Sequence, residues 1–339
     1  MVNLSRDQGF RQTLFSVSQD FPLWGKRTLR TSVAEANANA ARGREGTLAR
    51  ELEERVKVVF AEYYRAHYAI RVTRDMHSLL HAVAGTAQTR YAQGLANQSD
   101  AIRADLEQTR LDPELAGLER DEQVAKAKIN ALIARPAEAP LAEPMVLRRI
   151  PAAPSLSLDQ LMVRARDNNP EVAGMRAEIA AAEGERKLVD KSWYPDVTVS
   201  VGGDDLPNMS PRVTAGVGIK IPLQWGVRGA EARAATAKKG AARARLDAAL
   251  LRIESELKSA LASLRQAEHT ADVLKNTLSH QSEAAYRSTL TSYQLGRGDL
   301  TSVLDAAHQQ LAIRVELLRA QTEAQMALAA IERLVGGDL

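Results

Sequence analysis

The chain has 339 residues, of which 45% are apolar and only 4% aromatic, and its formal net charge is +3. Compact cores usually contain more aromatic side chains, whereas long helices packed side by side can be built from Ala and Leu. The absence of Cys excludes disulfides and cysteine-based metal sites, and the interspersed acidic and basic residues argue against a nucleic-acid partner.

The first part of the chain, residues 1–135, reads as a strand followed by two helices. A strand is expected over about residues 11–21. Residues 26–91 contain no Pro and many helix formers, which predicts a rod about 100 Å long. A turn at Gly94 separates this helix from a second one over 99–135, for which Ser99 is a plausible N-cap and Pro113 marks an interruption.

Residues 136–156 carry five prolines and no periodicity, and we interpret them as an extended linker. The segment from 157 to 339 then begins with a helix over 158–193. A capping box from Ser157 to Gln160 starts this helix, and Pro170 restarts it.

Two strands over 196–202 and 212–221 show the cleanest alternation in the chain, with Val and Ile on one side and Thr, Ser, Gly and Lys on the other. Each is close to the 9–11 residues that a tilted membrane strand needs. Two further helices are expected over 227–293 and 299–335. Apolar residues seven apart in the first of these, beginning at Leu250 and Ile253, predict coiled-coil packing.

An unusual junction occurs twice, as FPLWGKR at 21–27 and IPLQWGVR at 221–228. The turns YAQG (91–94) and YQLG (293–296) recur in the same order, which indicates an internal two-fold repeat. At each junction Pro ends a strand, Gly permits a bend and Trp suits a boundary between apolar and wet surroundings. The junction residues are Pro22, Trp24, Gly25, Pro222, Trp225 and Gly226.

Several segments together resemble the TolC-like outer-membrane efflux proteins over nearly the whole chain. The residues that carry the resemblance are DNNPEV (167–172), YPDVTVSVG (194–202), IPLQWGVRGAEARAA (221–235), YQLGRGDLTSVLDAAHQQL (293–311) and IERLVGG (331–337). FPLWGKR is most similar to the heavy-metal branch of that family.

The resemblance implies a mainly α fold with a small β part. Long antiparallel helices would form an α-barrel, a coiled-coil tunnel across the periplasm, and the strands would join a trimeric β-barrel in the outer membrane of a Gram-negative bacterium. The implied function is the passive exit duct of a resistance-nodulation-division type tripartite efflux system that exports metal cations. The implied partners are two further copies, a periplasmic adaptor (membrane fusion protein), an inner-membrane pump and outer-membrane lipid.

Family members contribute four strands per chain, whereas only three are evident in this sequence. The first residues also lack the basic and apolar regions of a signal peptide. We therefore expect that the opening helix, the first strand and the export signal are missing from this chain.

The resemblance also implies a gate at the periplasmic tips of the helices. Asp305 falls on an acidic gate residue, and Ser302 stands where the family has a second acidic one. Tyr293 matches an aromatic member of the latch, Ser99 and Asp100 match its partners, and Arg297 lies beside a basic position. Three copies of Asp305 around an axis would attract cations.

Little in the sequence favours catalysis or a resident cofactor. His77 and His81 share one helical face at a spacing that can bind a metal, but two surface histidines are the commoner case. No nucleophile–base pattern or phosphate-binding Gly loop is evident, so we expect no enzyme activity. The alternative function is a soluble coiled-coil scaffold or interaction protein, against which the two membrane-length strands argue.

Overall fold

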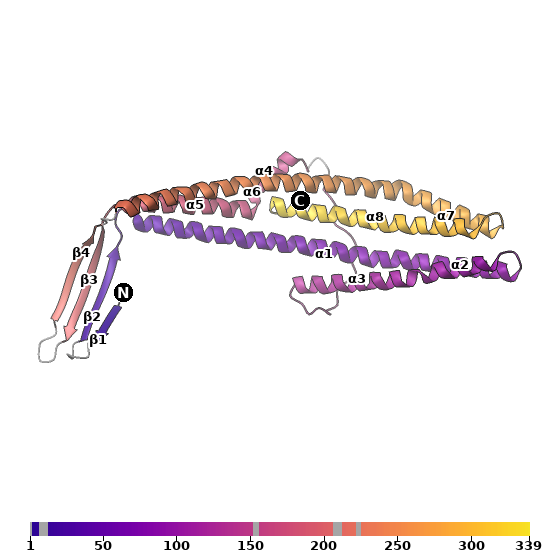
Figure 1. Ribbon diagram of the computed structural model, residues 1–339, viewed down its shortest axis with the longest axis horizontal. Coiled ribbons are helices and arrows are strands. Elements are labelled where there is room, and N and C mark those ends of the chain that lie inside the picture. The colour runs from indigo at the N-terminus through magenta and orange to yellow at the C-terminus, as the bar shows by residue number, and fades with distance from the viewer. Residues whose placement is uncertain (1, 7–12, 152–155, 206–211, 222–224) are drawn as a thin grey trace. The chain divides into compact units, whose positions relative to one another are not determined.

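A computed structural model describes the chain except for residues 1, 7–12, 152–155, 206–211 and 222–224. Its strands are β1 (Val2–Arg6), β2 (Thr13–Phe21), β3 (Asp196–Asp205) and β4 (Arg212–Lys220). Its helices are α1 (Lys26–Ala92), α2 (Gln98–Thr109), α3 (Leu111–Leu132), α4 (Leu158–Asn168), α5 (Pro170–Lys191), α6 (Trp225–Val273), the π-helical turn η2 (Leu274–Leu278), α7 (Ser279–Gln294) and α8 (Leu300–Val335) (Figure 1). The predicted fold class, mainly α with a small β part, is confirmed.

Contacts between residues within the chain divide the molecule into two compact units, and each unit is built from both halves of the sequence. The first comprises residues 1–46 and 170–251, and the second comprises residues 47–169 and 252–339. These units are a division in space. The division into repeats at 1–135 and 157–339 runs along the sequence, so it stays a prediction.

The first unit contains one antiparallel sheet in the order β1-β2-β3-β4 (Figure 1). Val199 pairs with Val217 and Val17 pairs with Val201, so the apolar residues of neighbouring strands share one face. Ser200 and Gly216 pair on the opposite face. The apolar face is open, because Val213 and Val217 are 74% and 75% exposed.

The prediction of three strands is wrong, because Val2–Arg6 forms a fourth strand, β1, which pairs with Thr13–Val17 of β2. Its five residues are too few to show a convincing alternation by themselves. The pairing depends on β2 being in place, and a sequence pattern cannot reveal that.

The predicted long helices exist, with two interruptions. The helix predicted over 99–135 is divided at Arg110, between α2 and α3, close to the predicted break at Pro113. The helix predicted over 227–293 contains η2, whose wider turn no local sequence signal announced. Among the described helices, none has an apolar stretch long enough to cross a membrane.

One of the two predicted helix N-caps forms in the structure, and the other does not. Ser157 caps α4 as predicted, because its hydroxyl accepts a hydrogen bond from the amide of Gln160 at 3.4 Å. Ser99 is not an N-cap. The helix begins one residue earlier, at Gln98, and Asn97 takes the cap position without a side-chain hydrogen bond.

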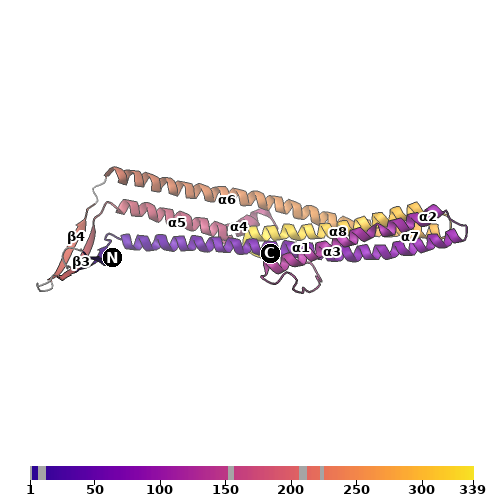
Figure 2. The same cartoon turned by 60° about the horizontal axis from the view of Figure 1, so that its bottom comes forward.

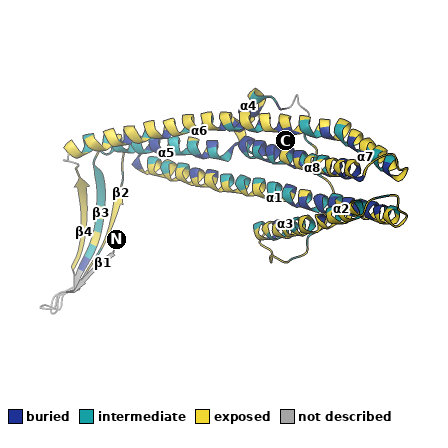
Figure 3. Ribbon diagram, turned by 45° about the vertical axis from the view of Figure 1, so that its right-hand side comes forward, coloured by how far each residue is buried: buried dark blue, intermediate teal, exposed yellow. Residues whose placement is uncertain are grey.

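The core of the second unit lies where α1, α2, α7 and α8 meet. Leu80, Val83 and Ala87 of α1 are buried there against Val303 and Ala307 of α8. Figure 3 shows α8 buried along much of its length, and Figures 1 and 2 show α2 and α3 running back along the second part of α1.

The predicted apolar seam of the long helix lies inside the protein. Ile253 and Leu257 are fully buried, and Leu264 and Ala267 are 1% exposed. The seven-residue spacing therefore predicted which face of this helix packs against its neighbours.

Candidate functional site

The helical tips end in two turns of the same kind. Gly94 and Gly296 have φ angles of +72° and +75°. In each turn the glycine amide donates to the carbonyl of the preceding tyrosine, Tyr91 or Tyr293, and the next amide donates to the carbonyl five residues earlier. This is the Schellman motif, which favours Gly because other residues are strained at positive φ. The prediction that these glycines stop the helices is confirmed.

Arg90 connects the two tips. Its guanidinium carbon lies 4.8 Å from the centre of the Tyr293 ring, and its Nη1 donates to the Tyr293 carbonyl. Its Nη2 donates to the carbonyl of Leu95 at 3.3 Å. Tyr293 is 2% exposed. Burial raises the pKa of its hydroxyl, the Arg90 charge lowers it and the Asp100 carboxylate raises it, with a net increase.

The predicted gate residues of the second tip do not converge on one point. Ser302 donates from its amide and its hydroxyl to Asp299, which caps α8, and these bonds lower the pKa of the Asp299 carboxyl. Asp305 is exposed one turn further along and has no hydrogen bond or ion pair to any described residue. Arg297 is exposed, and its amide closes the turn on Ser292.

Ser99 and Asp100 of the first tip lie at the start of α2. Ser99 is exposed, while Asp100 is half-buried and its charge acts on Tyr293. The structure therefore brings Tyr293 and Asp100 within electrostatic range. The direct partner of Tyr293 is Arg90, which sequence reasoning missed even though it directly precedes the YAQG turn.

His77 contacts α2 and α3, and His81 contacts α2. His77 Nε2 lies 3.4 Å from the carboxylate of Asp112, and His81 Nδ1 lies 3.2 Å from the side-chain oxygen of Gln108. Within the described ranges, no group of three His, Cys, Asp or Glu residues is arranged to hold a metal ion.

The first strand–helix junction is held by a buried lysine. Trp24 and Gly25 have φ angles of +61° and +77°, so the backbone turns sharply between β2 and α1. Lys26 is 5% exposed, and its ammonium donates to the Asp196 carboxylate at 2.7 Å and to the Tyr194 carbonyl at 2.8 Å. The Trp24 ring lies 5.3 Å from that of Tyr194, and Trp24 is 55% exposed.

The second junction is described only in part. Pro222 lies outside the described residues, and Trp225 is the first residue of α6. Gly226 does not provide a bend as predicted, because it lies inside the helix and is not among the glycines with positive φ. Both junctions carry Trp-Gly, but α6 begins at the Trp whereas α1 begins after the Gly.

A buried carboxylate joins the linker to the helices of the second unit. Glu332 of α8 is 2% exposed, and it accepts hydrogen bonds from both terminal nitrogens of Arg148, at 2.5 and 3.0 Å, and from Lys57 at 2.7 Å. The amide of Leu339 donates to it at 3.2 Å. Burial alone would raise the pKa of Glu332, but these donors outweigh it and the pKa is lowered.

Further contacts fix the linker backbone. Tyr63 donates to the carbonyl of Ala142 at 3.2 Å, Tyr68 to that of Met145 at 3.1 Å, and Gln325 to that of Arg148 at 2.7 Å. No helix or strand forms in the described part of the linker, as its prolines predict. We call the contacts of Arg148 and Lys57 with Glu332 the clamp. The clamp was not predicted, because its residues lie far apart in sequence.

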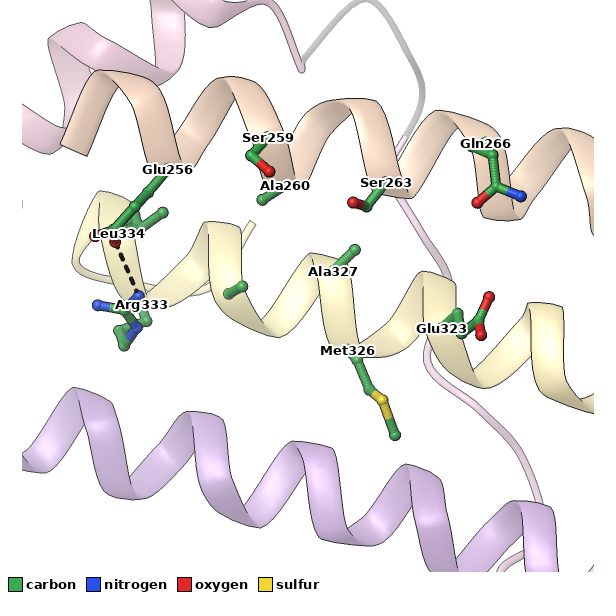
Figure 4. Close-up of a pocket in the computed structure, with 11 residues that line it drawn as sticks. Glu256, Ser259, Ala260, Ser263, Gln266, Glu323, Met326, Ala327, Arg333 and Leu334 are labelled. Carbon is green, nitrogen blue, oxygen red and sulfur yellow. Dashed lines mark hydrogen bonds and ion pairs between the residues drawn. The ribbon is translucent and has the colours of Figure 1, made fainter. Parts of the chain in front are cut away.

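A groove of about 530 Å³ runs between α6 and α8 (Figure 4). Arg333 closes one end and pairs with Glu256 at 3.3 Å and with Glu54 at 2.8 Å. The other polar groups, among them Ser263 and Glu323, are spaced along the helices and do not converge on one point (Figure 4). This arrangement does not favour a catalytic centre.

Comparison with known proteins places these features in context. A model of the outer membrane efflux protein family matches residues 161–337. The chain is 25% identical over 316 residues to the cobalt-zinc-cadmium resistance protein CzcC of Cupriavidus metallidurans, covering 93% of this chain and 74% of CzcC.

Two solved structures show the same fold at low identity. The chain is similar to CusC with a TM-score of 0.84 and 16% identity, covering 99% of this chain and 82% of that chain. It is similar to the outer membrane protein VceC of Vibrio cholerae with a TM-score of 0.80 and 18% identity, covering 100% of this chain and 85% of that one.

Proposed function

Because the chain belongs to the outer membrane efflux protein family, we propose that it is the outer-membrane exit duct of a tripartite efflux system. The observation that carries this proposal is the sheet of the first unit. One face is apolar and exposed, and the other is polar, as expected for a sheet with lipid on one side and water on the other. A soluble scaffold would have no use for such a face.

The edges of the sheet support a shared assembly. β1 and β4 are edge strands in the described sheet, and unpaired backbone groups in lipid cost several kcal/mol each. Pairing β4 of one copy with β1 of the next would remove both edges, and a closed ring of identical subunits is the symmetric solution. We propose a homotrimer, following the family resemblance, with the long helices in the periplasm.

We also propose partners, a gate and a cargo for this chain, following the role of the family. The helices would meet a periplasmic adaptor and an inner-membrane pump, and the tips would carry the gate residues Asp305, Ser302, Tyr293, Arg297, Ser99 and Asp100. The cargo proposed is a divalent metal cation, which the name of the similar protein CzcC supports. Trp24 and Tyr194 suit the boundary between lipid and periplasm.

The first test is fractionation of cells that express the complete gene. The protein is expected in the outer-membrane fraction and in solution only after detergent extraction. Recovery from the aqueous fraction without detergent would refute the duct.

A matched pair of substitutions tests which face meets lipid. Val217→Lys places a charge on the apolar face and should cost about 2–4 kcal/mol at the bilayer midplane. Thr214→Lys lies on the opposite face, three pairs along the same β3–β4 ladder, and is expected to be tolerated. Equal amounts of both variants in the outer membrane would contradict the assignment of the faces.

A further inference from the structure

The turns at the two tips of one chain are both bonded by one side chain, that of Arg90. This residue lies in the last turn of α1, and its two terminal nitrogens donate to different turns. One donates to the carbonyl of Leu95 in the first tip, and the other to the carbonyl of Tyr293 in the second tip. The carbonyl of Tyr293 also accepts the amide of Gly296, so Arg90 is bonded to the turn itself.

The two tips differ at this point although their turns are alike. Tyr293 is 2% exposed beneath the Arg90 guanidinium, whereas its counterpart Tyr91 is 45% exposed. Aligning the two YxxG turns places Ser292 opposite Arg90. A serine has neither the length nor the forked donors to make the reciprocal contact, so the tie has a direction, from the first repeat to the second.

The contacts between α2 and α8 next to the two turns do not involve Arg90. Arg103 of α2 donates to Thr301 of α8 at 3.4 Å, and Glu107 of α2 lies 2.9 Å from His308 of α8. The buried cluster that contains Val303 and Ala307 lies beneath them. The helices should therefore stay packed when Arg90 is replaced, and only the coupling of the turns should change.

We propose that Arg90 ties the two helical tips of each copy together and thereby favours a closed tip. It acts as a positioning residue that holds the Tyr293 turn and touches no transported solute. This inference rests on the proposed function for its consequence at the gate, but the tie itself is a property of one chain. A guanidinium suits the role because its rigid fork bonds two acceptors and also stacks on an aromatic ring.

Distance measurements between spin labels test the tie directly. The chain contains no Cys, so Leu95→Cys and Leu295→Cys, at exposed positions of the two tips, give a clean labelled pair. Labelled chain would be diluted with unlabelled chain so that only distances within one copy are measured.

Arg90→Gln is expected to lengthen and broaden the distance distribution, and Arg90→Lys to do so less. Arg110→Gln is the matched control, because Arg110 is exposed and, among the described residues, its side chain pairs only with Glu107, three residues earlier in the chain. It should leave the distribution unchanged. Distributions for both Arg90 variants equal to that of the unsubstituted chain would overturn the tie.

Planar-bilayer conductance in potassium chloride then tests the consequence for the gate. Loss of a charge-assisted hydrogen bond predicts about a tenfold rise in open probability for Arg90→Gln. A broadened distance distribution with unchanged open probability would overturn the role in closure. If no form of the protein conducts, the proposed duct function fails, and the label distances still decide whether Arg90 ties the tips.

Discussion

Replacing Arg148 by Ala is expected to release the linker, residues 136–156, from the helices. Arg148 supplies two of the four hydrogen bonds to Glu332, whose side chain is 3% exposed. The remaining donors, Lys57 and the Leu339 amide, do not replace the two hydrogen bonds that the Arg148 guanidinium makes to Glu332.

The magnitude follows from the burial of the two partners. Removing one partner of a buried ion pair costs about 3–5 kcal/mol. Lys57 stays in place and the Arg148 side chain is 43% exposed, so a lower value is appropriate, about 2 kcal/mol. The population of the opened linker should then rise about thirtyfold.

Limited proteolysis measures this population, because cleavage follows the open fraction when opening is faster than cutting. A protease specific for apolar residues is required, since the substitution removes an arginine. Met145 and Val146 are natural cleavage points because both are exposed. Arg149→Ala is the control, as Arg149 is exposed and has no ion pair or hydrogen bond to the described residues. Cleavage rates within twofold of each other in the two variants would refute the clamp.

Three further outcomes are expected. The pKa of Glu332 is lowered in the folded state, so its ionised form stabilises the fold above pH about 4.5, and this contribution is lost as pH falls through the lower folded value. The difference in thermal unfolding temperature between the unsubstituted chain and Glu332→Gln should therefore shrink in that pH range. A difference that stays constant with pH would argue against this contribution of Glu332. Gly43→Ala should destabilise the fold by about 1–3 kcal/mol, because the added Cβ would collide with the backbone of α5. Gly85→Ala, also in α1 but with open space around the added Cβ, should be neutral or stabilising by up to about 1 kcal/mol. Thermal unfolding followed by circular dichroism compares the two variants, and equal effects would contradict the close approach of α1 and α5 at Gly43. Asp305→Ala should lower the cation preference of the pore, measured as a reversal potential across a salt gradient, while Glu316→Ala on the same helix should not; unchanged selectivity would remove Asp305 from the gate.

Much of the local structure was predictable because its signals are local. The alternation around Val199 and Val217 specified two strands and their apolar side, since side chains alternate with a period of two. Gly94 and Gly296 specified two helix ends, since positive φ is strained for other residues. The Ser157 cap likewise depends only on residues within one turn.

Predictions failed where the outcome depended on a partner elsewhere in the chain. β1 is a strand because β2 pairs with it, and Gly226 lies within a helix although its counterpart Gly25 turns the chain. The same short motif therefore has two conformations, and its surroundings decide between them.

The sequence by itself determined the elements, the apolar seam and the faces of the sheet, because periodicity and turn chemistry act over a few residues. Only the tertiary structure decided which charges meet. Lys57 and Glu332 are 275 residues apart, and Arg90 and Tyr293 are 203 apart. A charged residue that will be paired and buried has the same local sequence signature as one that stays in water, so packing of distant helices alone distinguishes them.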